Sequence, residues 1–515
     1  MNSAMYDASQ GNNSGAHISV LTKSGTNKIH GSGWEEWQNS DMNAAPFFYN
    51  ANNLPTPFLN RNMFGGTVGG PIKKDKVFFF GSYQGIRVSD QQESLRDVTV
   101  PLGLTNDRSS AGIINAMQTS FGKTITASQI NLAALDMLQA KLPNGQYLIP
   151  SAQITDPTTA TNLGYDAVVQ GRNSLAPVNQ GIGNMDYLVN EKDRLSGKFY
   201  IQNNPTTNPF GAVGSLLGFG QQLSAGSVVG TLSNNMILSP TVTWEQHVGF
   251  TRLRAYANTS SAFSAGALGI SFPNTNNFPQ FAIGTSDPTI SNGLEFGPSV
   301  SFGNAGMYQN QWEYESSLNM VKGRHTIAVG GQVDHTQLNI INNNTGTDSL
   351  DFSSFLTFVE GKPRSGQEFA GSASRYYRSN TVGLYVNDNF KLRSNLTITA
   401  GFRWDYDGPL SEKYGKLTSF DQSQYAYDVA SDTITSSGLV IAKNGSDSLM
   451  KQHQWGFAPR IAIAWSPRPK MTVRAGYGIY YDRGELFSYL SPSAGAGFNG
   501  PFGVTLAPPL MLFHQ

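Results

Sequence analysis

Residues 395–406, NLTITAGFRWDY, indicate the fold class because they alternate strictly between two kinds of side chain. Apolar and aromatic side chains fill the even positions from Leu396 to Tyr406, while polar side chains or glycine fill the odd positions from Thr397 to Asp405. Successive side chains of a strand point to opposite faces, so the pattern predicts a β-strand with one apolar and one polar face. A tilted strand needs about ten residues to cross a membrane, whereas strands of soluble proteins usually have about five or six.

The same alternation recurs along the chain, for example in residues 471–482 and 242–250. Short turns join neighbouring runs, and we predict them at Ile72–Lys76, Asn190–Asp193, Ser239–Thr241, Val321–Arg324, Lys391–Asn395 and Ser466–Lys470. Long segments rich in Asn, Ser, Thr, Gly and Pro separate the hairpins, at Asn39–Asn60, Val88–Gly183, Asn203–Ala225, Ala257–Tyr308, Ile341–Tyr377 and Pro409–Gln452. Bacterial barrels alternate short periplasmic turns with long outer loops in this way. A soluble β-sandwich, the alternative, has no reason to sort its loops by length.

One run near Ile29–Gln38 and six hairpins give about 13 strands by pattern. We therefore predict an all-β fold, a transmembrane antiparallel β-barrel. Single-chain bacterial barrels have an even number of strands, so we expect this one to be partial. Residues 1–15 have neither the basic nor the apolar region of a signal peptide, and no final strand ending in an aromatic residue follows residue 482. We therefore expect the natural chain to extend at both ends. One helix is expected in the longest loop, where Thr126–Gln129 resembles a capping box and apolar residues follow at helical spacing from Ile130 to Leu142.

Composition excludes several function classes. Charged residues make up 14% of the 515 residues, and 35 basic side chains balance 35 acidic ones. Zero net charge argues against a nucleic-acid partner, because such binding neutralises phosphates. The chain has no cysteine, which excludes disulfides, thiol catalysis and cysteine-ligated metals. The seven histidines show no close metal-ligand spacing, and no nucleophile elbow or phosphate-binding loop is present. We therefore expect no enzyme activity, with no catalytic residue, no cofactor and no bound metal.

Polar residues that alternate with the apolar ones are the candidate functional residues. If the apolar face meets lipid, the other face lines the lumen, and the candidates on it are Lys198, Gln202, Glu245, His247, Gln332, Asp334, Arg403, Asp405 and Arg474. One interpretation is that they hydrogen-bond to a plug and to lumen water. The other is that some of them line a substrate path.

Four segments resemble the large TonB-dependent receptor-like proteins of Acidobacteria, the Oar-like group. The two most specific are Gly15–Trp37, GAHISVLTKSGTNKIHGSGWEEW, and Arg61–Arg87, RNMFGGTVGGPIKKDKVFFFGSYQGIR, in which Met63 and Gln84 depart from the family's usual Gln and Glu. The other two, Val382–Pro409 and Phe457–Arg483, resemble motifs common to many barrels.

The resemblance implies a 22-stranded barrel whose lumen is filled by an N-terminal plug. On that basis residues 1–27 would be the C-terminal remnant of the plug and residues 28–515 the N-terminal part of the barrel. The intact protein would lie in the cell outer membrane, in contact with lipid, and would import a bulky nutrient such as a glycan or a chelated metal with energy from the TonB complex. The cargo is not specified. Two alternatives stay open: a surface adhesion or interaction barrel with little transport, and a gene fragment without function.

Overall fold

The computed structural model describes most of the chain. The described residues are 2–3, 7–11, 16–17, 20–47, 50, 56–90, 95–101, 103–151, 165–171, 174–210, 216–271, 277–284, 294–298, 304–342, 348–371, 374–449, 455–481 and 503–506.

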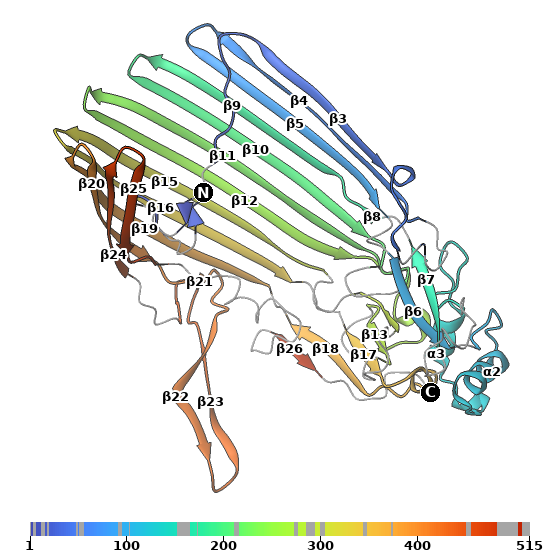
Figure 1. Ribbon diagram of the computed structural model, residues 1–515. Coiled ribbons are helices and arrows are strands. Elements are labelled where there is room, and N and C mark those ends of the chain that lie inside the picture. The colour runs from blue at the N-terminus through green and yellow to red at the C-terminus, as the bar shows by residue number, and fades with distance from the viewer. Residues whose placement is uncertain are drawn as a thin grey trace.

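One antiparallel sheet of 15 strands dominates this part of the chain (Figure 1). Two of its members are very short, β8 (Ser174–Leu175) and β21 (Ser411–Glu412). The other thirteen are β3 (His30–Asn39), β4 (Leu59–Lys73), β5 (Val77–Asp90), β9 (Val178–Asn190), β10 (Asp193–Asn208), β11 (Gln221–Ser239), β12 (Val242–Thr259), β15 (Asn304–Lys322), β16 (His325–Asn342), β19 (Arg375–Arg393), β20 (Leu396–Asp407), β24 (Trp455–Arg468) and β25 (Met471–Gly478). The predicted all-β antiparallel fold is confirmed, and the thirteen long strands match the runs found in the sequence.

All six predicted short turns join consecutive strands at one end of the sheet, and the long segments lie at the other end (Figure 1). The β15–β16 turn needs Gly323, whose φ of 61° is costly for residues with a side chain. Most of the strands are longer than the ten residues expected, and β11, β15 and β19 each have 19; β3 has ten and β25 has eight. Residues 203–208, assigned above to a loop, continue β10. Backbone hydrogen bonds extend the ladder beyond the point where apolar alternation ends, so alternation alone gave strand ends too early.

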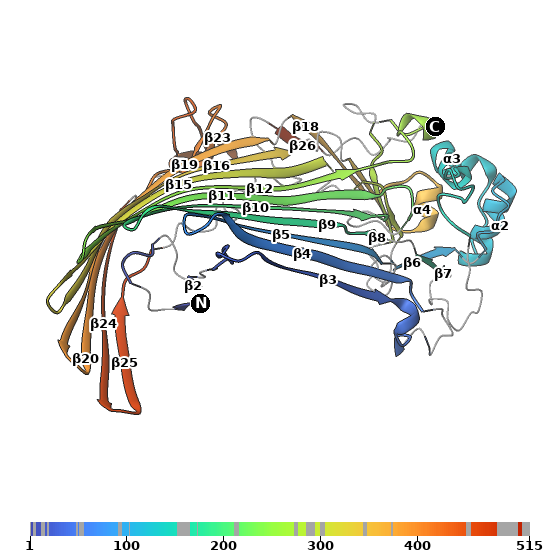
Figure 2. The ribbon, with the colours of Figure 1, turned by 90° about the horizontal axis from the view of Figure 1, so that it is seen from above.

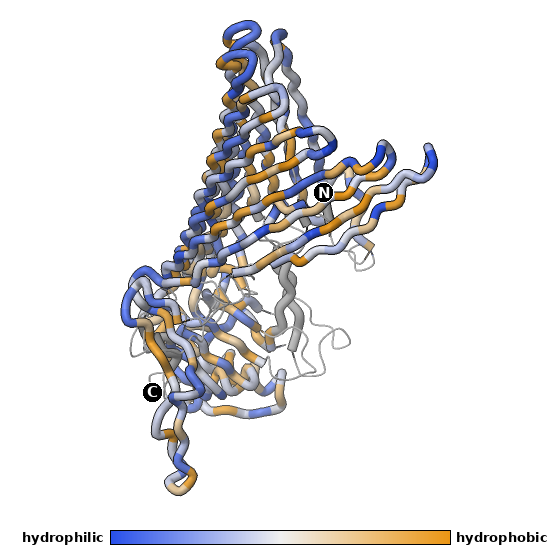
Figure 3. The backbone as a smooth tube through the Cα atoms, turned by 90° about the vertical axis from the view of Figure 1, so that its left-hand side faces the viewer, coloured by the Kyte–Doolittle hydropathy of each residue, from blue (hydrophilic) through white to orange (hydrophobic). Residues whose placement is uncertain are grey.

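The sheet is strongly curved, and the described N-terminal residues lie on its concave side (Figure 2). Apolar and polar residues alternate along each strand (Figure 3). The convex face carries exposed apolar side chains such as Leu232, Val248 and Leu384. Because register partners of an antiparallel pair share a face, the pairs Leu232–Val248 and Val248–Tyr314 place these side chains on one continuous surface.

The long segments fold into a subdomain with its own apolar core, which the polar composition of these segments did not predict. A smaller sheet contains β13 (Gln280–Ile283), β14 (Leu294–Phe296), β17 (Ser349–Phe352), β18 (Ser365–Gly371) and β26 (Gly503–Leu506). The helices α2 (Ser110–Phe121), α3 (Leu132–Gln139) and α4 (Phe355–Val359) share a buried cluster with it that includes Phe281, Phe296, Phe352 and Phe358. Segments following β5, β10, β12 and β16 all contribute to this cluster. Their apolar residues are scattered, so only the tertiary structure gathers them.

The predicted helix is also corrected. The capping box at Thr126 caps only the short 3-10 turn η3 (Ala127–Gln129), and α3 begins after its own cap, Asn131, which accepts a hydrogen bond from Ala133 N at 2.9 Å. The remaining short elements are β1 (Asn2–Ser3), β2 (Ala16–His17), η1 (Ser40–Met42), β6 (Leu95–Pro101), β7 (Tyr165–Gly171) and η4 (Gly266–Leu268). A hairpin of β22 (Thr418–Asp428) and β23 (Thr433–Ile441) projects beyond the sheet (Figure 1). Within the described ranges, no helix combines the length and apolar character needed to span a membrane.

Candidate functional site

The nine candidate residues share the concave face. In the strand register, Arg403 pairs with Tyr385, and Tyr385 pairs with Gly330. Gly330 pairs with Ser317, and Ser317 pairs with Glu245. These pairs follow one face of the sheet across β20, β19, β16, β15 and β12. Further register pairs and strand alternation place all the others on it: Lys198, Gln202, His247, Gln332, Asp334, Asp405 and Arg474. Their inferred common face is therefore present. That this face lines a lumen stays a prediction.

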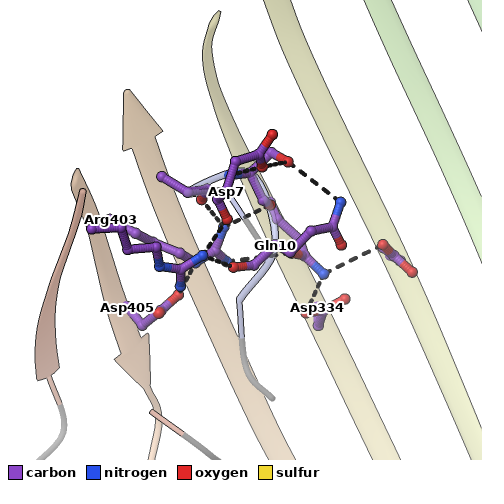
Figure 4. Close-up of polar contacts among 10 residues, drawn as sticks. Asp7, Gln10, Asp334, Arg403 and Asp405 are labelled. Carbon is purple, nitrogen blue, oxygen red and sulfur yellow. Dashed lines mark hydrogen bonds and ion pairs between the residues drawn. The ribbon is translucent and has the colours of Figure 1, made fainter. Parts of the chain in front are cut away.

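Four of the nine meet in one buried polar network (Figure 4). Arg403 is fully buried, and its Nε donates to Oδ1 of Asp405 at 2.6 Å. Its Nη2 donates to Oε1 of Gln332 at 3.4 Å. The Nε2 of Gln332 donates in turn to Oδ2 of Asp334 at 3.1 Å and to Oε1 of Glu313 at 3.3 Å. A buried charge is stable only when paired and hydrogen-bonded, and this network meets both conditions for Arg403.

The network holds the N-terminal segment Asp7–Gly11 by its backbone. Nη1 of Arg403 donates to the carbonyl oxygens of Ser9, at 3.1 Å, and Ala8, at 3.4 Å. These contacts close over the guanidinium and account for its complete burial. Gly11 is needed there, because a Cβ at that position would lie 1.9 Å from Nε of Arg403.

Two further residues hold the same segment and were not among the candidates. Nη1 of Arg460 on β24 donates to the carbonyl oxygens of Asp7 and, at 2.7 Å, Gln10. The backbone N–H of Ala8 donates to Oδ1 of Asn387 on β19 at 3.5 Å. Both residues occupy concave-face positions by register, so strict application of the alternation to β19 and β24 would have found them.

A second contact region lies several strands away, on β9. The side-chain amide of Asn184 donates to Oγ1 of Thr22 at 3.0 Å and to the carbonyl of Lys23. The hydroxyl of Ser24 donates to Asp186, which also pairs with Arg194 at 2.8 Å. Asn184 and Asp186 are both buried. The segment before β3 is thus held at two places on the concave face.

The other five candidates do not join the Arg403 network. Gln202 accepts a hydrogen bond from Tyr200, and Nδ1 of His247 lies 3.0 Å from Oγ of Ser233. Lys198, Glu245 and Arg474 are exposed on the face. Among the described residues, no three histidine, aspartate or glutamate side chains are arranged to hold a metal ion. The observed chemistry is recognition of backbone carbonyls by guanidinium groups.

Comparison with known proteins identifies the family. A model of the family described as "Outer membrane beta barrel domain" matches residues 21–509. The chain belongs to this family. This outer-membrane barrel protein therefore resides in the cell outer membrane, and its family is one of membrane barrels and not of enzymes. No curated protein matches its sequence.

Several solved outer-membrane proteins are similar in part. The outer membrane transporter YddB from Escherichia coli is 9% identical, with 88% of this chain and 52% of that chain covered and a TM-score of 0.44. The siderophore receptor PirA from Acinetobacter baumannii is 10% identical, with 90% and 44% covered and a TM-score of 0.41. A ferric enterobactin receptor mutant from Pseudomonas aeruginosa is 9% identical, with 90% and 46% covered and a TM-score of 0.40. The barrel protein spans about half the length of these structures, and its family assignment rests on the family model.

Proposed function

We propose that this protein is the barrel portion of a TonB-dependent receptor of the Oar-like group, which imports a bulky nutrient such as a glycan or a chelated metal. Residues 1–27 are then the end of the plug, and the concave face with its nine candidates lines the lumen. The motifs in Gly15–Trp37 and Arg61–Arg87 support the group. The observation that carries the proposal is the binding of Asp7–Gly11 to the concave face by Arg403 and Arg460.

These contacts suit a segment that must be both held and released. The two arginines bind mainly backbone carbonyls, so they hold the segment without a specific side-chain lock. Each hydrogen bond from a charged arginine to a neutral carbonyl stabilises the bound segment by about 1.5–3 kcal/mol at most. We propose that a mechanical pull through TonB overcomes this energy. Displacing the segment would uncover polar groups on the concave face and open a hydrated path.

A disulfide lock tests the transport function. The chain has no native cysteine, and a Cβ at Gly401 would lie 2.8 Å from Cβ of Ala8. Disulfides hold their Cβ atoms about 3.5–4.5 Å apart, so Ala8→Cys/Gly401→Cys can form the bond once the segment moves back by about 1 Å. In cells expressing the full-length gene, we expect oxidation to block uptake of radiolabelled ferric citrate or of a fluorescent maltodextrin, and reduction to restore it. Deleting TonB should abolish the same uptake. The Ala8→Cys single variant is the matched control. Uptake that is insensitive to both the lock and TonB would refute the proposal.

One observation favours surface adhesion as a second function. The β22–β23 hairpin exposes apolar side chains, including Val429 at 82%, Phe420 at 61% and Ile434 at 60%. Exposed apolar side chains on a projecting hairpin suit contact with another surface. If adhesion dominates, removing residues 418–441 should abolish cell attachment while uptake of both probes is unchanged.

A further inference from the structure

Two arginines lie on the convex, apolar face of the sheet, where charge is not expected. Arg252 and Arg254 follow Phe250 at every second residue of β12, so all three point the same way. Phe250 packs against Trp312 of β15, with ring centroids 5.4 Å apart. Aromatic girdles mark the edges of the apolar band of a membrane barrel. The arginines therefore begin where the apolar band ends.

Neighbouring strands place the edge of the band within one register step of Phe250. On the convex face, Trp312 is followed by Asn310 on β15, and Val333 is followed by His335 on β16. On β10 the last apolar residue is Ile201, one register step beyond Phe250. A stepped edge is what strands tilted in a membrane produce. Arg252 pairs with Asn310 in the register and so stands at the headgroup level, on the side of the long segments.

Polar neighbours hold both guanidinium groups. Nη2 of Arg254 donates to Oδ1 of Asn203 at 2.8 Å, and Nη1 of Arg252 donates to Oδ1 of Asn310 at 3.3 Å. Arg252 also lies over the ring of Tyr308, 5.4 Å from its centroid. A guanidinium has five N–H donors, so these contacts orient the two groups and leave donors for an anion.

The surroundings are positive without a compensating acid. Beyond the edge of the band, the convex-face positions on β10, β11, β12, β15 and β16 include Asn203, Pro205, Thr207, Ser224, Gly226, Tyr256, Asn258, Gly306, Tyr308, Asn310, His335, Gln337 and Asn339, and no aspartate or glutamate. Among the described residues, neither arginine forms an ion pair with a carboxylate. In a protein of zero net charge, this local excess of positive charge indicates an anionic ligand.

We propose that Arg252 and Arg254 bind the phosphate of a lipid headgroup in the leaflet on the side of the long segments. Arginine binds phosphate with paired, charge-assisted hydrogen bonds. The acyl chains of the bound lipid would then lie along the apolar band formed by Phe250, Trp312 and Val248. The site is separate from the concave face, so it holds whether the barrel transports or adheres.

Lipid retention tests the site. The full chain is reconstituted in phosphatidylcholine nanodiscs with and without lipid A, a phosphorylated glycolipid, and retained lipid is counted by native mass spectrometry. We expect Arg252→Gln/Arg254→Gln to weaken lipid A retention about thirtyfold, since each arginine near an anionic surface contributes about fivefold. The matched control is Lys322→Gln/Arg324→Gln, which removes two positive charges at the opposite end of β15 and its turn.

Two further arms sharpen the result. Lipid A stripped of its phosphates should be retained no better by the unaltered protein than by the double arginine variant. Heat-modifiable migration in electrophoresis establishes that each variant is folded. Equal losses of lipid A in the arginine variant and in the control would show a general charge effect and overturn the proposal. Unchanged retention of lipid A in a folded arginine variant would overturn it as well.

Discussion

Arg403 and Asp405 stand two residues apart on β20, on the same face, and their side chains form an ion pair of 2.6 Å that is closed off from solvent. Here the backbone of Asp7–Gly11 covers the pair, and Gln332 approaches it from β16. The pair therefore links β20 to β16 and to the N-terminal segment, since Arg403 contacts all three.

Removing one member of this pair should be costly. Arg403→Gln leaves the buried carboxylate of Asp405 without its cation, and we expect a loss of about 3–5 kcal/mol in the free energy of unfolding. Unfolding in guanidinium chloride, with the folded fraction read from heat-modifiable migration in electrophoresis, measures this free energy. The double variant Arg403→Gln/Asp405→Asn should recover much of the loss, because no charge then stays buried. Equal stability of the single and double variants would contradict this view of the pair.

The glycine opposite the pair should not tolerate a side chain. A Cβ on Gly383 of β19 would lie 2.1 Å from Nη2 of Arg403 and 2.9 Å from Oδ1 of Asp405. Overpacking of this kind costs about 1–3 kcal/mol, so Gly383→Ala should lower stability by that amount. Gly230→Ala on β11, where nothing lies within 4 Å of the added carbon, is the control and should change stability by less than about 0.5 kcal/mol.

The two faces of the sheet should respond oppositely to charge. Leu232 lies on the convex face with 55% of its surface exposed, and Thr231 lies on the concave face of the same strand. Arginine facing the middle of the hydrocarbon costs about 2–4 kcal/mol, so Leu232→Arg should reduce the folded fraction in outer membranes. Thr231→Arg should leave it unchanged. If Thr231→Arg is the more damaging variant, the assignment of the faces is wrong.

The subdomain formed by the long segments, which contains β14 and β17, should be less stable at neutral than at acidic pH. Burial raises the pKa of Glu295, and the nearby carboxylate of Asp351 raises it further. The folded state therefore binds this proton more tightly than the unfolded state, and stability is full below the ordinary glutamate pKa and falls as pH rises through the raised pKa. Resistance of the subdomain to proteolysis, measured against pH, should follow that trend. Glu295→Gln should flatten it, and an equally steep profile in that variant would assign the trend to another group.

The sequence alone determined the two-faced strands, their number, the short turns and the face of every candidate residue. These properties are local: alternation with a period of two assigns each side chain to a face, and a hairpin needs only a few adjacent residues to close. Arg403 and Lys198 carry the same signal, and the sequence could not separate them.

Only the tertiary structure decided that Arg403 is buried and Lys198 exposed, because the cover over Arg403 comes from residues almost 400 positions away. The core of the subdomain formed by the long segments likewise depends on residues that are far apart in the sequence. Phe281, Phe296, Phe352 and Phe358 come from two segments separated by strands, and none forms a periodic run. Burial is set by which distant segments meet, and no period in the sequence records that.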